Sequence, residues 1–248
     1  MRGVRTIRDG RTVKPRIRVV TFDLDNTLWD VHSVIGNAER TLRAWFDERI
    51  PEVNQTFDGD GLLALRTRIV EENPEIVHNL TELRRTTFVR SIEQCGYDPR
   101  SAVRLADEAM VVFLDARHDV TFFDGALEVL EELASRYLLG ALSNGNADVF
   151  RLGLGDFFSF DYSAAKVGAS KPAPDMFHAA LEHTGADPEQ MVHVGDHLEH
   201  DIRAAANLGI HTVWVNLTGE RYPDDAPATV EVSDLRDVPS RIDELAGS

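Results

Sequence analysis

A pair of aspartates, two positions apart, is the first feature of this chain that could do chemistry. Asp23 and Asp25 directly follow a run of mostly apolar residues from 17 to 22. Side chains two apart on a strand share a face, and just past the strand's end one carboxylate can attack while the other moves a proton. Such a pair suits phosphoryl or acyl transfer on an α/β sheet. Alone, it suits a turn equally well, because Asp favours turns.

Three further polar clusters stand where an apolar run ends or a helical pattern opens. They are Ser143 with Asn144 after the run 138–142, Ser170-Lys171-Pro172, and Gly195-Asp196 after the run 191–194, with Asp201 on the helix expected next. The carboxyl ends of parallel strands meet at one edge of a sheet. We therefore expect all four clusters to converge.

The elements that position these clusters alternate between strands and helices after Asp124. Strands are expected near 18–23, 138–142, 160–163, 191–194, 211–215 and 230–232, and helices near 126–135, 147–152, 174–184, 201–208 and 238–245. Alternation of this kind predicts an α/β fold with a doubly wound parallel sheet.

A long helical segment interrupts this pattern between the first strand and the rest. From 34 to 117 apolar residues recur at spacings of three and four, which predicts four amphipathic helices. The 28 positions between Ser143 and Lys171 leave no room for a second insertion. We therefore expect a core of residues 1–32 and 118–248 with an inserted four-helix cap, residues 33–117.

Composition narrows the possible partners. The net charge of −16 argues against nucleic acid, and no apolar run approaches the length of a membrane span. The basic segment 1–18 lacks the apolar stretch of a secretory signal. Cys95 is the only cysteine, so no internal disulfide can form, which fits a reducing cytoplasm. We expect a cytoplasmic monomer or weak homodimer that acts on a small molecule.

Taken together, the four clusters resemble the motifs of the haloacid dehalogenase superfamily, in its phosphatase branch. The first motif matches residues 23–27, the second Ser143 with Asn144, the third Lys171 with Pro172, and the fourth residues 195–201, all in family order. The resemblance implies a Rossmann-like core, a Mg²⁺ cofactor and a phosphate monoester as substrate.

The resemblance also implies a role for each motif residue. Asp23 is the expected nucleophile and Asp25 the general acid and base, with Lys171 offsetting charge on the nucleophile and the phosphate. Ser143, Asn144, Lys171 and Thr27 form the expected phosphate-binding group, Thr27 as a turn hydroxyl that supports Asp25. Mg²⁺ is expected on Asp23, Asp196 and the backbone carbonyl of Asp25, with Asp201 orienting waters or Lys171.

Other functions remain as alternatives to the phosphatase. A sugar-phosphate mutase would use the same aspartate pair. A binding protein with a dead site would lack a charged motif residue, and all are present. Dehalogenases of this superfamily lack the second acid, so Asp25 disfavours that reaction. His193, His197 and His200 suggest zinc, but no cysteine accompanies them.

A narrower resemblance concerns bacterial flavin-pathway phosphatases. It rests on residues 74–78, 90–94 and 144–158. It implies 5-amino-6-(5-phospho-D-ribitylamino)uracil or flavin mononucleotide as substrate, in riboflavin metabolism. In the expected cap, Arg84 and Arg85 are the candidate contacts to the remote part of such a substrate.

Overall fold

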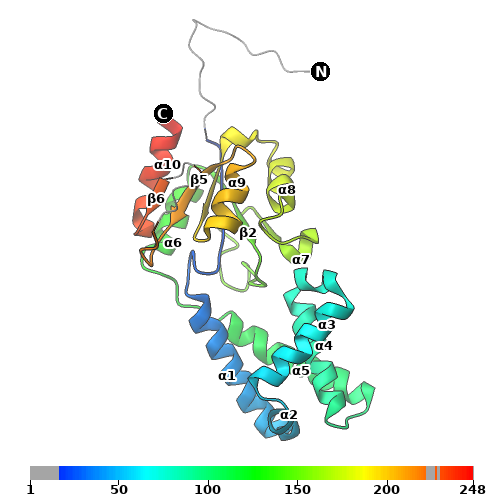
Figure 1. The fold of residues 1–248 in the computed structure, drawn as a ribbon. Coiled ribbons are helices and arrows are strands. Elements are labelled where there is room, and N and C mark those ends of the chain that lie inside the picture. Colours follow the sequence, from blue (N-terminus) through cyan, green and yellow to red (C-terminus); the bar gives the residue numbers. More distant parts are fainter. Residues whose placement is uncertain (1–16, 222–226, 228–229, 248) are drawn as a thin grey trace, which may run out of the picture.

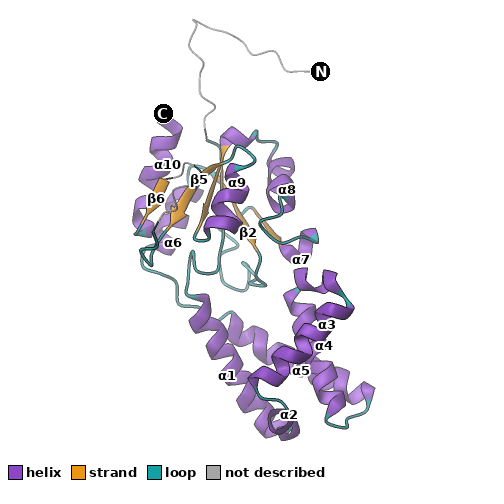
Figure 2. Ribbon diagram, viewed as in Figure 1, coloured by secondary structure: helices purple, strands orange, loops and turns teal. Residues whose placement is uncertain are grey.

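A six-stranded parallel sheet forms the centre of the chain in the computed structural model, which describes residues 17–221, 227 and 230–247. The strand order is β3-β2-β1-β4-β5-β6, and every neighbouring pair is parallel (Figures 1 and 2). The strands are β1 (Val19–Phe22), β2 (Leu138–Ser143), β3 (Phe160–Ser163), β4 (Met191–Gly195), β5 (His211–Val215) and β6 (Val230–Val232). The predicted doubly wound α/β sheet is confirmed.

The alternation of side chains along the strands builds a separate hydrophobic layer on each face. Val20 and Phe22 of β1 pack in the cluster that contains helices α6 (Ala126–Ala134) and α10 (Val238–Gly247). Val19 packs on the other side, in the cluster that contains α8 (Asp175–Thr184) and α9 (Ala204–Ala206). Side chains on a strand alternate between faces, so a single buried strand supports both layers. A short helix, α7 (Ala164–Val167), follows β3.

The segment between β1 and β2 is helical and has a hydrophobic cluster of its own. Its elements are α1 (Val31–Arg49), α2 (Pro51–Thr56), α3 (Gly59–Glu72), the 3-10 helix η1 (Pro74–His78), α4 (Leu80–Gln94) and α5 (Pro99–Arg117). The four expected amphipathic helices correspond to α1, α3, α4 and α5, and α2 is an additional short helix. Figure 1 shows these helices as a layer beside the carboxyl end of the sheet. Because their buried residues form a cluster apart from the two core clusters, we propose residues 33–117 as a cap domain.

Two antiparallel segments connect this cap to the core. Trp29 forms an isolated bridge with Phe122, and the Phe123 amide donates to the Leu28 carbonyl at 2.9 Å. Hydrogen bonds also join the cap to core loops, among them His78 to Ser170 at 2.9 Å and Asn146 to Thr81 at 3.1 Å.

Two expected helices differ in the structure. Residues 147–152 form turns, because the Asp148 carboxylate accepts from the amides of Phe150 and Arg151 and closes the chain locally. The helix expected at 201–208 is a π-helix, η3 (Leu198–Arg203), followed by the three-residue α9. The His197 ring accepts from the amides of Glu199 and His200, so the helical turn starts earlier than expected.

Among the described residues no helix combines the length and the apolar character that crossing a membrane requires. The basic segment 1–18 lies outside the described residues except for its last two positions.

Candidate active site

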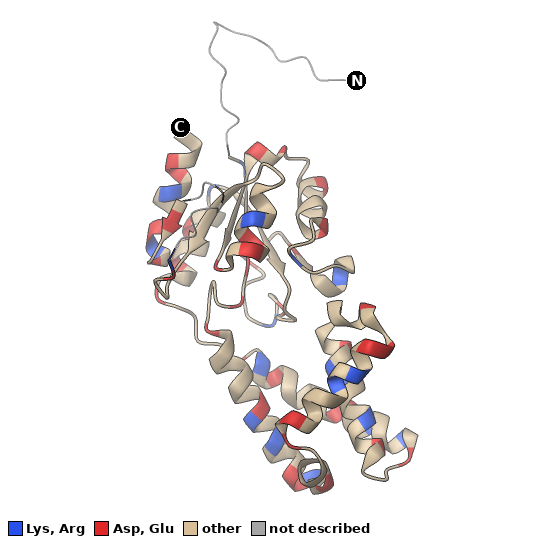
Figure 3. Ribbon diagram, in the orientation of Figure 1, with Lys and Arg blue, Asp and Glu red and all other residues tan. Residues whose placement is uncertain are grey.

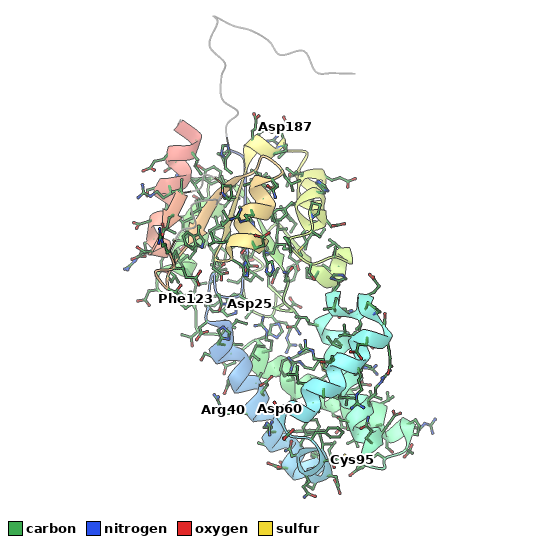
Figure 4. All side chains as sticks on the ribbon, in the orientation of Figure 1. Asp25, Arg40, Asp60, Cys95, Phe123 and Asp187 are labelled. Atoms are coloured by element: carbon green, nitrogen blue, oxygen red, sulfur yellow. The ribbon has the colours of Figure 1, made fainter. Side chains whose placement is uncertain are left out.

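The predicted motif residues meet at the carboxyl edge of the sheet, where the strand order reverses between β1 and β4. Ligand sites of open α/β sheets form at this point. A cavity of about 150 Å³ opens there. It is lined by Asp23, Asp25, Asn26, Ser143, Asn144, Gly145, Lys171, Asp196, His197, His200 and Asp201. Figure 4 shows Asp25 at the junction of core and cap.

Lys171 is the central cation of the cavity. Its buried ammonium donates to Asp23 Oδ1 at 2.7 Å, Asp201 Oδ1 at 2.6 Å and the Leu142 carbonyl at 2.6 Å. Asn144 fixes the backbone beneath it: Asn144 Oδ1 accepts from the Lys171 amide at 2.7 Å, and Nδ2 donates to the Lys171 carbonyl at 2.9 Å. The second motif therefore positions the third.

The carboxylates carry more charge than Lys171 balances. Burial raises the pKa of Asp23 well above its ordinary value, although Lys171 works against the shift. Burial, reinforced by Asp201, raises the pKa of Asp196 to about 6. Both shifts express the unfavourable free energy of holding negative charge in a dry site.

Asp201 remains charged because the lysine lies beside it. Burial alone would favour its neutral form, but Lys171 and His193 outweigh burial and hold the pKa of Asp201 below its ordinary value. Burial likewise opposes the charge on Lys171, yet Asp201 and Asp23 raise the pKa of the lysine. Asp201 Oδ1 accepts from Lys171 and lies 3.2 Å from His193 Nε2, and Oδ2 accepts from the His197 amide at 3.0 Å. Both carboxylate oxygens are thus engaged.

Thr27 connects Asp23 of the first motif to Asp196 of the fourth motif. Its buried hydroxyl lies 3.0 Å from Asp196 Oδ1 and 3.5 Å from Asp23 Oδ2, and one hydroxyl hydrogen can serve only one of them at a time. The Thr27 hydroxyl therefore contacts the two carboxylates, whereas we expected it to support the turn at Asp25.

The donor set fits a hard divalent cation. Oxygens of Asp23, Asp196 and Asp201 lie within 4.8 Å of one another. Mg²⁺ prefers oxygen ligands and is typically held by one or two carboxylates with waters and substrate phosphate. Both oxygens of Asp201 accept hydrogen bonds, at 2.6 and 3.0 Å. Within the described residues, Oδ2 of Asp23 has only the Thr27 hydroxyl at 3.5 Å, which Asp196 shares, so Asp23 and Asp196 are the better candidates. A cation there would also offset the excess negative charge.

The histidines give no support to a zinc site. In the described part of the chain the candidate metal-binding cluster contains aspartates only. His193 is fully buried on β4, with Nδ1 2.9 Å from the Thr21 hydroxyl and its ring edge-on to Phe177. The rings of His197 and His200 stack at 3.9 Å on the cavity wall.

Asp25 has two partners that the sequence motifs do not contain. Arg117 Nη2, from the end of α5, lies 2.7 Å from Asp25 Oδ1 and 2.8 Å from Oδ2. Trp29 Nε1 donates to Asp25 Oδ1 at 2.8 Å. Arg117 continues the buried stripe of Ala109 and Phe113 on its helix. A charged residue at a buried helical position was the available signal.

The loop after β2 approaches Asp25 closely. The Gly145 amide donates to Ser143 Oγ at 3.0 Å, which folds the loop back on itself. A Cβ atom on Gly145 would lie 2.4 Å from Asp25 Oδ2. Any residue other than glycine at this position would therefore displace the Asp25 carboxylate.

The two candidate cap arginines have different surroundings, and neither lines the active-site cavity. Arg84 lies 3.7 Å above the Phe113 ring and lines a separate cap cavity of about 270 Å³ with Arg43 and Arg66. Burial, reinforced by Arg66, lowers the pKa of Arg84 to about 10. Arg85 pairs on the surface with Asp107 at 2.7 Å. Figure 3 shows basic residues in blue along the cap helices, interspersed with acidic residues in red.

Comparison with known proteins gives the same grouping. Residues 17–209 match the model of the haloacid dehalogenase-like hydrolases. The chain is 33% identical over 200 residues to 5-amino-6-(5-phospho-D-ribitylamino)uracil phosphatase YigB of Escherichia coli K12, covering 81% of this chain and 84% of that protein. It is 30% identical to pyrimidine 5'-nucleotidase YjjG of the same organism, covering 88% and 95%.

Among solved structures, a 2-haloacid dehalogenase from Pseudomonas syringae pv. Tomato DC3000 matches with a TM-score of 0.89 and 39% identity. The match covers 92% of this chain and 99% of that one.

Proposed function

The chain belongs to the haloacid dehalogenase-like hydrolases, and from this premise we propose that it is a magnesium-dependent phosphatase that works through a phosphorylated Asp23. One observation carries the proposal: the cavity that holds Asp23, Lys171 and Asp196 is also lined by a second carboxylate, Asp25. Phosphate monoester hydrolysis needs this second group to move protons.

In the first step, a carboxylate oxygen of Asp23 attacks the phosphorus atom of the ester. The bond between phosphorus and the ester oxygen breaks, and that oxygen takes a proton from Asp25. The products are the free alcohol, an aspartyl-phosphate at Asp23 and an ionised Asp25. Lys171, 2.7 Å from Asp23 Oδ1, offsets negative charge as it develops on the phosphoryl oxygens.

In the second step, a water molecule attacks the same phosphorus atom. Asp25 takes the proton of the water, and the bond between phosphorus and Asp23 breaks. Inorganic phosphate leaves, Asp23 is again a carboxylate and Asp25 is again an acid. The loop of Ser143 and Asn144 is the proposed hydrogen-bonding partner of the phosphate oxygens in both steps.

The proposed cation ligands are Asp23, Asp196 and the backbone carbonyl of Asp25. When bound there, Mg²⁺ supplies positive charge that screens the phosphate dianion from the carboxylates. Asp201 is proposed to act indirectly, because it holds Lys171 and the His197 amide.

The proposed substrate class is the phosphoribityl intermediate of flavin synthesis or flavin mononucleotide. The 33% identity to YigB supports this choice. Arg84 is the favoured cap contact, since it borders a cavity with two further arginines and no ion pair is found for it in the described part of the chain. Arg85 already has Asp107 as a partner.

Dehalogenation is a second candidate, favoured by the relative from Pseudomonas syringae that bears that name. Displacement of a halide requires no proton donor, because halide ions leave unprotonated. Asp25, held by two donors, therefore has no proton to deliver when the halide leaves, whereas cleavage of a phosphate ester needs one, which is why we favour the phosphatase.

A substrate panel with purified protein tests the proposal. The panel contains phosphoribityl, flavin, nucleotide and hexose phosphates and 2-chloropropionate, each with Mg²⁺ and with a chelator. We expect phosphate release that requires Mg²⁺, with the flavin-pathway esters preferred in kcat/KM, and no chloride release. Chloride release without phosphate release would assign dehalogenation. Transfer of phosphate to a second position of a hexose phosphate would assign a mutase.

A further inference from the structure

We propose that Arg117 is the positioning residue of Asp25 and that it makes the acid–base carboxylate dependent on the cap helices. This inference rests on the proposed function, because it concerns the proton transfers of that reaction. Arg117 is the last residue of α5, 92 positions from Asp25 in the chain.

The contact has the geometry of a fixed support. The Arg117 side chain is 1% exposed, and a single nitrogen, Nη2, lies within 2.8 Å of both oxygens of Asp25. Trp29 Nε1 donates to one of the same oxygens, Asp25 Oδ1, at 2.8 Å. Every hydrogen-bond partner found for the Asp25 carboxylate is thus a donor. Together these donors hold the carboxylate in one position.

A second connection runs from Arg117 to another cap helix. Arg117 Nε donates to Asn146 Oδ1 at 3.3 Å, and Asn146 Nδ2 donates to Thr81 of α4 at 3.1 Å. Asn146 belongs to the loop after β2, which also carries Ser143 and Asn144. A shift of α4 or α5 relative to the core would therefore displace Asp25 and this loop together.

Arg117 is poorly explained as a purely stabilising residue. Its Nη1 is buried and has no hydrogen-bond partner in the described structure. Leaving a buried donor unpaired is unfavourable for folding. An apolar side chain of similar length would fill the position without that cost, but it would leave Asp25 without its main support.

The consequence for the reaction is specific. Asp25 must reach the ester oxygen in the first step and the attacking water in the second, and a misplacement of about 1 Å costs about 10²-fold in rate. Arg117 contacts the carboxylate of Asp25, whereas the nucleophile Asp23 is held by Lys171. Its loss should therefore affect proton transfer and leave the nucleophile in place.

The test compares Arg117→Met and Arg117→Lys with a matched control, Arg151→Met. Arg151 also pairs with α5, through Asp115, but it lies on the surface away from Asp25. Each protein is assayed with Mg²⁺ on p-nitrophenyl phosphate, whose leaving group needs little protonation, and on glycerol 3-phosphate, whose leaving group needs a proton. Melting temperature and circular dichroism report folding.

For Arg117→Met we expect kcat on glycerol phosphate to fall about 10²-fold with KM nearly unchanged. On the aryl ester, the first turnover should stay within about tenfold of the native rate while steady-state turnover falls further, because the second step still needs Asp25. Arg117→Lys should recover part of the activity, and Arg151→Met should match the native protein.

A double-mutant cycle with Asp25→Asn separates positioning from general stability. If Arg117 acts through Asp25, Arg117→Met should add almost no further loss in the Asp25→Asn background. This double variant also leaves no unpaired carboxylate, which keeps the test usable if the single variant folds poorly. The inference would be overturned if the activity losses of the two variants were additive. It would also be overturned if Arg117→Met lost equal activity on both esters, the first turnover included. In either case hydrolysis by the native protein would leave the proposed function standing. Absence of hydrolysis by the native protein would overturn both.

Discussion

At the scale of single residues, the site is an arrangement of charges that one lysine does not balance. Three aspartates lie close together at the carboxyl edge of the sheet: Asp23, Asp196 and Asp201. Lys171 contacts Asp23 and Asp201. Burial, reinforced by the neighbouring aspartates, raises the pKa values of Asp23 and Asp196, so negative charge on these two carboxylates is unfavourable. This charge distribution supports the proposed cation and the proposed esterification of Asp23.

The two acids of the first motif should give different mutant phenotypes. Asp23→Asn removes the nucleophile, so no phosphoenzyme should form with any phosphate ester as substrate. Asp25→Asn should slow alkyl phosphate hydrolysis by about 10²–10⁴-fold. With an aryl phosphate it should retain a first burst of product, because that leaving group needs little protonation. Rapid-quench kinetics measures both steps, and a burst in Asp23→Asn would assign the nucleophile to another residue.

Proton and metal should compete for Asp196. Its pKa in the fold, about 6, lies above the ordinary value for aspartate. The stabilisation from protonating it is therefore complete at low pH and is lost as the pH rises through about 6. Mg²⁺ should replace the proton, so it should raise the melting temperature more at about pH 7.5 than at about pH 5.

Thermal melts with and without Mg²⁺ at the two pH values measure this difference directly. The variant Asp196→Asn should lose most of the Mg²⁺-dependent shift at the higher pH. An equal Mg²⁺ effect at both pH values would remove Asp196 from the metal site.

The sequence identified the residues at strand ends and missed those that arrive from elsewhere. Asp23 and Asp196 were predicted because a parallel sheet brings the ends of its strands together. Lys171, which follows the short helix α7, was predicted from its place at the start of a helical pattern and from the motif resemblance. The contact of Trp29 with Asp25 was not predicted, although Trp29 lies only four positions further along the chain. The contact of Arg117 with Asp25 was also missed, because Arg117 comes from cap helix α5. The position of a cap helix against the core depends on tertiary packing, which local spacing does not encode.

At the scale of elements, the loop after β2 connects the proposed phosphate-binding motif to the proposed acid–base residue, Asp25. Gly145 has no side chain that would displace the Asp25 carboxylate. The side-chain amide of Asn144 forms hydrogen bonds with the backbone of Lys171. The sequence predicted a short helix just beyond this loop, at 147–152. Capping by Asp148 made turns instead, because a side chain that bonds to nearby amides competes with helix formation.

Gly145→Ala tests the importance of this close approach. A Cβ atom there would lie 2.4 Å from Asp25 Oδ2, so one of the two must move. We expect kcat on an alkyl phosphate to fall about 10²-fold, with little change in the melting temperature. Gly36→Ala on α1 is the control, since its Cβ would meet only the end of Arg40 at 3.5 Å. Gly36→Ala should keep full activity, and an active Gly145→Ala would show that Asp25 tolerates displacement.

At the scale of the whole molecule, the cap and the core have separate hydrophobic clusters, and core residues line the active-site cavity. The alternation of strands and helices predicted the sheet, and the helical spacing predicted the four longer cap helices. The contacts between the two parts, such as His78 with Ser170 and Asn146 with Thr81, join residues far apart in the chain. The proposed specificity depends on the cap, and the proposed chemistry depends on core residues together with Arg117 at the end of cap helix α5.

Arg84 provides a test of that division. Arg84→Ala should lower kcat/KM for a phosphoribityl or flavin phosphate by about tenfold and leave p-nitrophenyl phosphate nearly unaffected, because the small ester has no remote part to hold. Arg85→Ala should have a smaller effect, since Asp107 already engages Arg85. The control is Arg104→Ala, which removes a surface pair with Glu108 on α5. Equal losses on all esters would place Arg84 outside substrate recognition.

The central claim is that this protein hydrolyses phosphate esters through an aspartyl-phosphate at Asp23. Its most direct measurement is to mix the protein with a phosphate ester and Mg²⁺, quench with acid, reduce with borohydride and map the peptides. Borohydride converts an aspartyl-phosphate to homoserine. We predict homoserine at position 23 alone, formed with Mg²⁺ and absent with a chelator. Homoserine at another position, or ester hydrolysis at an equal rate in chelator, would contradict the account.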